Sequence, residues 1–194
     1  MGPNSNGGPC RSQGVPPLNV FALVIYIPEP LGGFLDDLRR ELVPHYNPHA
    51  HVSVLPPRPL QVDWQSASRQ ARASIEGIAP FEVELTSIQV FQQTNVIYIE
   101  VGGGAAELYG LHAAMNRSAL AYQEPFEYHP HITLAQEIPI DRVGEQTDLA
   151  RRRWREYTGP RHFRADRAVF VQNATGTCWV DLADFVLGAV AVQK

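Results

Sequence analysis

The chain has 194 residues, of which 44% are hydrophobic and 19% are charged, and its net charge at pH 7 is −4. These values are ordinary for one globular domain, or for two small lobes that share a core, and they exclude a strongly basic surface that coats nucleic acid. No segment approaches the roughly 18 apolar residues of a membrane span, and the chain does not begin with an apolar leader. We therefore expect a cytoplasmic protein without membrane association.

The ends of the chain differ in composition from its middle. Residues 1–17 are rich in Gly, Pro and Asn and predict a disordered tail, whereas 18–187 predict a single bilobed domain and 188–194 a C-terminal end. The two cysteines, Cys10 and Cys178, have neither CxxC nor zinc-ligand spacing. This usage favours a reducing compartment and predicts no disulfide framework.

Hydrophobic periodicity and turn residues predict the secondary structure in chain order. Asp63 is the expected N-cap of the second helix, and the polar turns 92–95 and 173–176 favour hairpins. Hairpins favour an antiparallel α+β fold over a doubly wound parallel sheet. The expected elements are strand 18–27, helix 31–43, strand 50–55, helix 63–76, strands 81–91 and 96–101, helix 105–121, strand 131–135, helix 141–157, and strands 163–173 and 177–187.

A strand–helix–strand unit occurs twice in this order. The tetrapeptide Val-Ile-Tyr-Ile at 24–27 recurs at 96–99, and a helical pattern and a His-x-[Ser/Thr] strand follow each copy. The tetrapeptide begins 27 residues before its histidine in the first unit and 35 residues before it in the second. The duplication predicts two pseudo-symmetric lobes, with mainly antiparallel sheets flanked by outer helices and with both motif strands at a central active-site groove.

The two motifs are His51-Val52-Ser53 and His131-Ile132-Thr133, which lie 80 residues apart. Residues i and i+2 of a strand face the same side, so each histidine projects together with a hydroxyl residue. Histidine titrates near neutrality and a hydroxyl hydrogen-bonds anionic oxygen. Two such pairs at one groove therefore predict acid–base chemistry on a phosphoester, and either histidine could be the base.

His49 and His129 each lie two residues before a motif histidine, so His-x-His also occurs twice. On regular strands, four imidazoles around one groove could hold zinc, and a metal-dependent hydrolase is the alternative that follows. Pro48 and Pro130 interrupt strand regularity there, and neither motif contains a carboxylate. We therefore expect no metal and no other cofactor, and we treat His49 and His129 as possible substrate contacts.

The segments 51–57 (His-Val-Ser-Val-Leu-Pro-Pro) and 129–135 (His-Pro-His-Ile-Thr-Leu-Ala), together with the order of elements around them, resemble the 2H phosphoesterase superfamily. The similarity covers roughly 18–187, and the branch it indicates resembles bacterial 2′-5′ RNA ligases and RNA 2′,3′-cyclic phosphodiesterases. It implies a bilobed α+β fold and metal-independent chemistry. It further implies His51 and His131 as catalytic residues, with Ser53 and Thr133 binding the substrate phosphate.

One departure from this family concerns arginine. Members that resemble the RNA ligases often carry an arginine just beyond the hydroxyl residue in one or both motifs, where this chain has Leu55 and Gln136. A guanidinium is well suited to phosphate contact, so the difference bears on the substrate class. Arg58 is a candidate replacement in the groove.

The sequence thus predicts a metal-independent phosphoesterase that acts on nucleotide or RNA phosphodiesters by two-histidine general acid–base catalysis. The reaction would be hydrolysis of a 2′,3′-cyclic phosphate or the formation or cleavage of a 2′-5′ linkage. A non-catalytic nucleotide-binding module of the same fold is a further alternative, because His and Ser/Thr also bind phosphate without cleaving it. The expected partner is a nucleotide or an RNA terminus, and no feature implies a stable protein partner.

Overall fold

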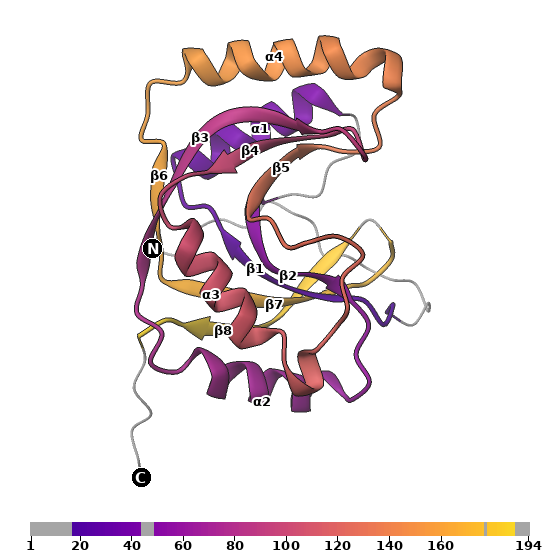
Figure 1. The fold of residues 1–194 in the computed structure, drawn as a ribbon, viewed down its shortest axis with the longest axis vertical. Coiled ribbons are helices and arrows are strands. Elements are labelled where there is room, and N and C mark those ends of the chain that lie inside the picture. The colour runs from indigo at the N-terminus through magenta and orange to yellow at the C-terminus, as the bar shows by residue number, and fades with distance from the viewer. Residues whose placement is uncertain (1–16, 44–48, 177, 189–194) are drawn as a thin grey trace.

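The structure, a computed structural model, describes residues 17–43, 49–176 and 178–188. It confirms the α+β class, with two four-stranded antiparallel sheets flanked by helices (Figure 1). The order in the first sheet is β2 (His51–Arg58), β1 (Phe21–Tyr26), β7 (Arg167–Asn173), β8 (Trp179–Val186). The order in the second sheet is β5 (His131–Ala135), β4 (Val96–Val101), β3 (Phe81–Phe91), β6 (His162–Ala165).

The sheet orders display the predicted pseudo-symmetry. The first copy of the tetrapeptide lies in β1 except for Ile27, which follows the strand, and the second copy lies in β4. Each of these strands pairs with a motif strand at the sheet edge, β2 or β5. The register within the two pairs differs by two residues. Tyr26 lies opposite His51, whereas Tyr98 lies opposite Thr133, so the two tyrosines are not equivalent with respect to the motifs.

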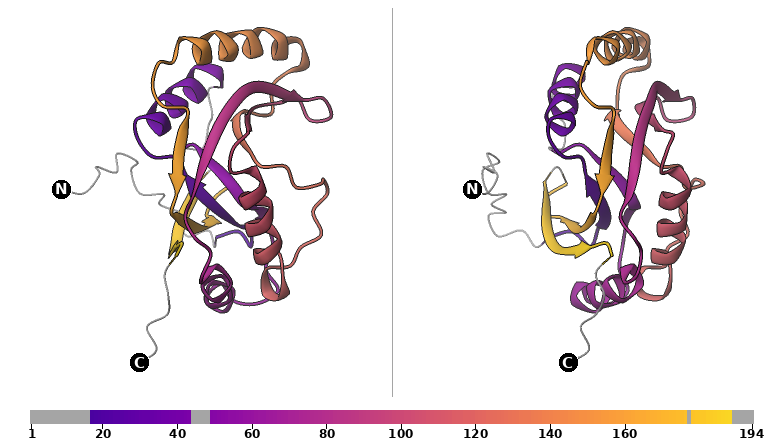
Figure 2. Two further views of the ribbon diagram at one scale, coloured as in Figure 1. Left: turned by 60° about the vertical axis from the view of Figure 1, so that its left-hand side comes forward. Right: turned by 90° about the vertical axis from the view of Figure 1, so that its left-hand side faces the viewer.

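The helices are exchanged between the two halves. Helix α1 (Leu31–Leu42) joins β1 to β2 but packs with α4 (Val143–Glu156) over the second sheet, near β5 and β3. Helix α3 (Ala105–Met115) joins β4 to β5 but packs against β2, beside α2 (Trp64–Ile75), as Figures 1 and 2 show. Each sheet is therefore covered by one helix from the other half, and the two lobes share one hydrophobic core.

Burial on alternate residues explains why the strands form where they do. Leu23 and Ile25 of β1 face the common core, while Ala22 and Val24 face the other way and pack with Val169 and other residues in a smaller buried cluster. Both faces of β1 are thus covered, as expected for a central strand that reads as a continuous apolar run.

The largest differences from the sequence prediction concern β6 and β7, the end of α3, and β2. The expected strand 163–173 is divided between the sheets, because the charged pair Asp166-Arg167 interrupts the alternation and the chain crosses from β6 to β7 there. Helix α3 ends at Met115, and a short 3-10 helix η1 (Ser118–Leu120) follows. Strand β2 continues through Pro56 and Pro57, which an edge strand tolerates because it has one side without ladder bonds. A second 3-10 helix, η2 (Ile140–Arg142), precedes α4.

Among the described residues, none of the helices is both long and apolar enough to cross a membrane. Cys178 is disulfide-bonded, so the expectation of no disulfide is wrong at this residue. Cys10 and the rest of the predicted tail up to residue 16 lie outside the described residues.

Candidate active site

The two motif strands present the same pattern of burial. In β2, Val52 and Val54 are buried in the core, whereas His51 and Ser53 on the opposite face are partly accessible. In β5, Ile132 and Leu134 are buried, and His131 and Thr133 are partly accessible. The period-2 alternation of a strand therefore places each histidine and its hydroxyl residue on one face, as the spacing predicts.

Each motif histidine is held by the backbone in the same way. Nδ1 of His51 lies 2.8 Å from the carbonyl oxygen of His49. Nδ1 of His131 lies 2.6 Å from the carbonyl oxygen of His129. A carbonyl only accepts hydrogen bonds, so Nδ1 carries the proton in both neutral rings. Nε2 of each imidazole is consequently the atom that exchanges a proton with a ligand.

A β-bulge follows the hydroxyl residue in both strands. In β2 the register shifts between Ser53 and Leu55, and in β5 it shifts between Thr133 and Ala135. The bulge reverses the alternation, so Leu55 and Ala135 are buried rather than facing the groove. Of the two positions at which related proteins often carry arginine, Leu55 belongs to the core and Gln136 faces the cavity described next.

A cavity of about 920 Å³ opens beside the two motif strands. Strands β2 and β5 lie side by side (Figure 1), and the cavity walls include Ser53, His131 and Thr133. His51 is not a lining residue, but it precedes Ser53 on the same face of β2 and is close enough to His131 for repulsion between the rings to lower its pKa. Further walls come from the β3–β4 turn and from the loop before β5: Phe91, Gln92, Gln93, Thr94, Val96, Glu124, Pro125, Phe126, Glu127 and Tyr128.

Both motif histidines are weak bases in this environment. Desolvation, followed by the charges of Arg39 and His131, lowers the pKa of His51 to about 4. Desolvation is also the main reason why the pKa of His131 is lowered, and the charge of His129 adds to it. The bonds to the two backbone carbonyls act in the opposite direction, because they favour the protonated ring, but they do not outweigh burial.

The outer histidines of the His-x-His pairs lie in different surroundings. His49 has a positive φ of 67°, and its side chain is 66% exposed beside Asp36. His129 is half-buried, lies with its Nε2 3.0 Å from a carboxylate oxygen of Glu100 and lines the cavity. The four imidazoles therefore do not surround one point, and among the described residues no group of three or more His, Cys, Asp or Glu side chains is arranged to hold a metal ion.

The structure places Arg58 outside the cavity. Its side chain is buried, and the guanidinium donates to the Pro56 carbonyl, to Asn116 Oδ1 at 2.8 Å and to the Leu120 carbonyl at 3.0 Å, and forms an ion pair with Glu124. Every arm of the guanidinium is engaged in fastening β2 to the segment that follows α3, and Arg58 is not among the residues that line the cavity.

Tyr128 and His112 hold the same strand edge, and no spacing or motif in the sequence indicates this role for them. The Tyr128 hydroxyl donates to the Ser53 carbonyl at 2.9 Å, and His112 Nδ1 donates to the Val54 carbonyl at 2.8 Å. The two rings stack with centroids 3.9 Å apart. Because these carbonyls belong to an edge strand, helix α3 and the loop before β5 together satisfy backbone groups at the first motif that no neighbouring strand pairs.

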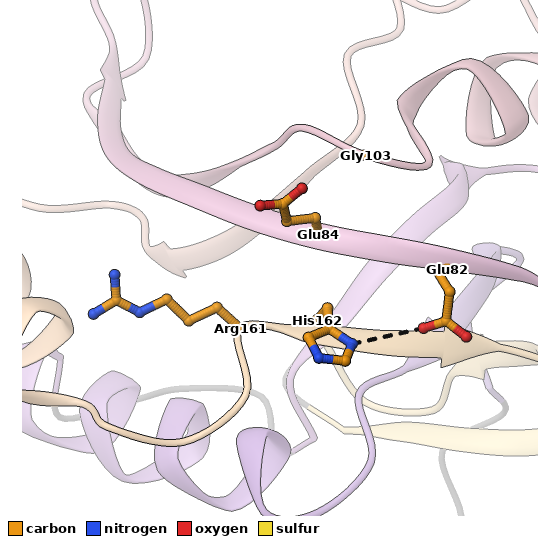
Figure 3. Close-up of a pocket in the computed structure, with 5 residues that line it drawn as sticks. All are labelled: Glu82, Glu84, Gly103, Arg161 and His162. Carbon is orange, nitrogen blue, oxygen red and sulfur yellow. Dashed lines mark ion pairs between the residues drawn. The ribbon is translucent and has the colours of Figure 1, made fainter.

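A second, smaller cavity of about 320 Å³ lies at the other end of β3 (Figure 3). Its polar side chains come from β3 and from the start of β6. His162 Nδ1 lies 3.7 Å from Glu82, while Arg161 extends away from this pair and donates to the Trp154 carbonyl. This cavity contains none of the motif residues, so the larger cavity is the candidate active site.

Comparisons with known proteins agree with this fold. The chain is 21% identical over 132 residues to BH1439 of Halalkalibacterium halodurans, classed by name as a phosphoesterase, in an alignment covering 64% of this chain and 74% of that protein. Escherichia coli LigT superposes with a TM-score of 0.63 at 13% identity, covering 88% of this chain and 98% of LigT. Usb1 of Kluyveromyces marxianus, solved with uridine monophosphate, superposes with a TM-score of 0.51 at 13% identity, covering 84% of this chain and 97% of Usb1.

The family assignment rests on the sequence itself. The sequence profile of the 2′-5′ RNA ligase superfamily matches residues 27–177, a range that contains both motifs and both cavity walls. The chain therefore belongs to the 2′-5′ RNA ligase superfamily, a group of 2H phosphoesterases.

Proposed function

We propose that this protein is a metal-independent phosphoesterase that hydrolyses a 2′,3′-cyclic phosphate on a nucleotide or an RNA terminus. The observation that carries the proposal is the duplicated arrangement of His51 and His131. Each ring is fixed through Nδ1 to the carbonyl two residues earlier, and each offers Nε2 on the face of its strand that also presents a hydroxyl.

Hydrolysis of a cyclic phosphodiester needs one proton acceptor and one proton donor at the same phosphorus. A neutral imidazole takes a proton from water, and its protonated twin gives one to the departing ribose oxygen. Ser53 and Thr133 donate to the non-bridging oxygens, where negative charge concentrates in the transition state. E. coli LigT, which superposes on this chain with a TM-score of 0.61, has been crystallised in complex with 3′-AMP. This complex supports a nucleotide as the substrate.

The direct test is a panel of 2′,3′-cyclic nucleotides and 2′-5′-linked dinucleotides, assayed with EDTA present. We expect turnover of the cyclic nucleotides to be unchanged by the chelator, because the proposed acid, base and phosphate donors are all side chains. Activity that EDTA abolishes and zinc or manganese restores would favour the metal-dependent alternative instead. Binding of these nucleotides without any turnover would identify a nucleotide-binding module.

The lowered pKa values predict where the pH optimum lies. Catalysis needs one neutral and one protonated histidine, and in the free protein this state is most populated between the pKa of His51, about 4, and the ordinary histidine value of 6.5. Below this window the base becomes protonated, and above it the acid loses its proton. We therefore expect a bell-shaped kcat/KM profile with its maximum on the acidic side of pH 6.5.

The profile of kcat should differ from that of kcat/KM. A bound phosphate is negatively charged and raises the pKa of both imidazoles, so the kcat maximum should lie at higher pH. Steady-state rates from pH 4 to 9 measure both profiles. A kcat/KM maximum above pH 7 would show that the two rings are not desolvated in the active protein.

A further inference from the structure

The cavity extends well beyond the two motifs. One wall is the β3–β4 turn and the other is the loop Glu124–Tyr128, so a ligand whose phosphate lies at the histidines has its remaining atoms between these walls. The volume of the cavity, about 920 Å³, is at the upper end of the range of about 300–1,000 Å³ for pockets that enclose one small molecule. The dimensions therefore suit a single nucleotide unit.

The guanidinium beside this cavity is compensated by a carboxylate, because Arg58 forms an ion pair with Glu124. His129 Nε2 lies 3.0 Å from a carboxylate oxygen of Glu100. Glu127, by contrast, is an exposed carboxylate on the cavity wall. With the pKa of both motif histidines lowered, the walls carry a surplus of negative charge at pH 7.

The remaining wall groups are amides and aromatic rings. Gln92 and Gln93 lie on the turn, and Gln136 follows the second motif strand. Phe126, 58% exposed, provides an aromatic ring on the opposite wall, and Tyr128, whose ring stacks on His112, lines the same wall. Amides hydrogen-bond the edges of nucleobases and aromatic rings stack on their faces, whereas neither group attracts a second phosphate.

We propose that this site selects ligands with a single phosphate and a neutral or cationic remainder, such as a mononucleoside phosphate, and that the Glu127 carboxylate rejects ligands with further phosphates. The inference rests on the proposed function for the position of the reacting phosphate. Glu127 is then a specificity-determining residue, since a phosphate monoester near it carries a charge of about −1.5 to −2.

The experiment compares the dissociation constants of 3′-AMP and adenosine 3′,5′-bisphosphate by calorimetry at low ionic strength, about 50 mM, where screening is weak. We expect the bisphosphate to bind about three- to thirty-fold more weakly, the range for like charges separated by a partly hydrated gap. Glu127→Gln should bring the two constants within about threefold. Gln136→Arg, which adds a cation to the wall, should make the bisphosphate the tighter ligand.

Glu107→Gln is the matched control, because it removes the same charge from an exposed position on α3 outside the cavity and should leave the ratio unchanged. Equal or tighter binding of the bisphosphate by the unaltered protein, or a ratio that Glu127→Gln does not move, would overturn the inference. The readout is independent of turnover. A preference for 3′-AMP in a protein that hydrolyses no cyclic phosphate would support the selectivity and refute the proposed function.

Discussion

His51→Ala and His131→Ala are each expected to lower kcat/KM on a 2′,3′-cyclic nucleotide by about 10²–10⁴-fold, the usual range for loss of a general acid or base. Both imidazoles are held through Nδ1 and differ mainly in their neighbours, so each of the two substitutions should lower kcat/KM. Each substitution should also remove one limb of the bell-shaped pH profile, because one of the two titrating groups is then absent. Steady-state kinetics from pH 4 to 9 measure both effects.

The same assay contains its controls. Ser53→Ala and Thr133→Ala should cost about tenfold each, since each removes one hydrogen bond of about 1–2 kcal/mol from an otherwise intact site. His162→Ala should leave the rate unchanged, because His162 is exposed at the far end of β3 and lines only the smaller cavity. Unchanged turnover in both motif-histidine variants would make the duplicated motif incidental and the proposed function wrong.

The duplication made the topology predictable from sequence to an unusual degree. The repeated tetrapeptide and motif predict two related halves with antiparallel sheets, and the structure has this symmetry, with β1 paired to β2 in one sheet and β4 paired to β5 in the other. Strands 81–91 and 96–101 and the Asp63 cap also agree with the structure, because each depends on local alternation or on a local turn. The exchange of α1 and α3 between the halves was not predictable, since the apolar stripe of a helix does not reveal which sheet it covers.

The limits of period-2 reasoning are visible at Leu55. Alternation from His51 and Ser53 places residue 55 on the groove face, but the bulge after Ser53 turns it into the core. The equivalent bulge in β5 leaves Gln136 at the cavity. A bulge is one extra residue in one strand of a pair, so it depends on the partner strand and leaves no mark in the local pattern.

The cavity walls show a similar limit. The segment 92–95 was predicted as a hairpin turn, which it is, but its role as a wall depends on how far the hairpin projects beyond β5. Tyr128 has no motif spacing at all, and it acts through its hydroxyl on the Ser53 carbonyl of the other half. Such contacts between distant segments follow from the tertiary arrangement and not from any periodicity.

Arg58 illustrates how burial changes the role of a charged residue. An arginine after Pro56 and Pro57 has the sequence context of a loop, yet β2 continues to Arg58 and its side chain is buried. Desolvation lowers the pKa of Arg58, while the nearby carboxylate of Glu124 favours the charged form. The ion pair therefore replaces the hydration that the guanidinium loses.

Arg58→Met is accordingly expected to lower the free energy of unfolding by about 3–5 kcal/mol, because it leaves the Glu124 carboxylate partly buried without its partner. The double variant Arg58→Met/Glu124→Gln should recover at least about 1 kcal/mol of this loss, since no unpaired charge then remains. Urea denaturation at pH 7 measures both values. Arg142→Met removes an exposed ion pair with Glu145 and should change stability by less than about 1 kcal/mol. If Arg58→Met changed the free energy of unfolding by as little as this control, the hydrogen bonds and ion pair of Arg58 would contribute little to stability. The guanidinium would then not be what fastens β2 to the segment between α3 and β5.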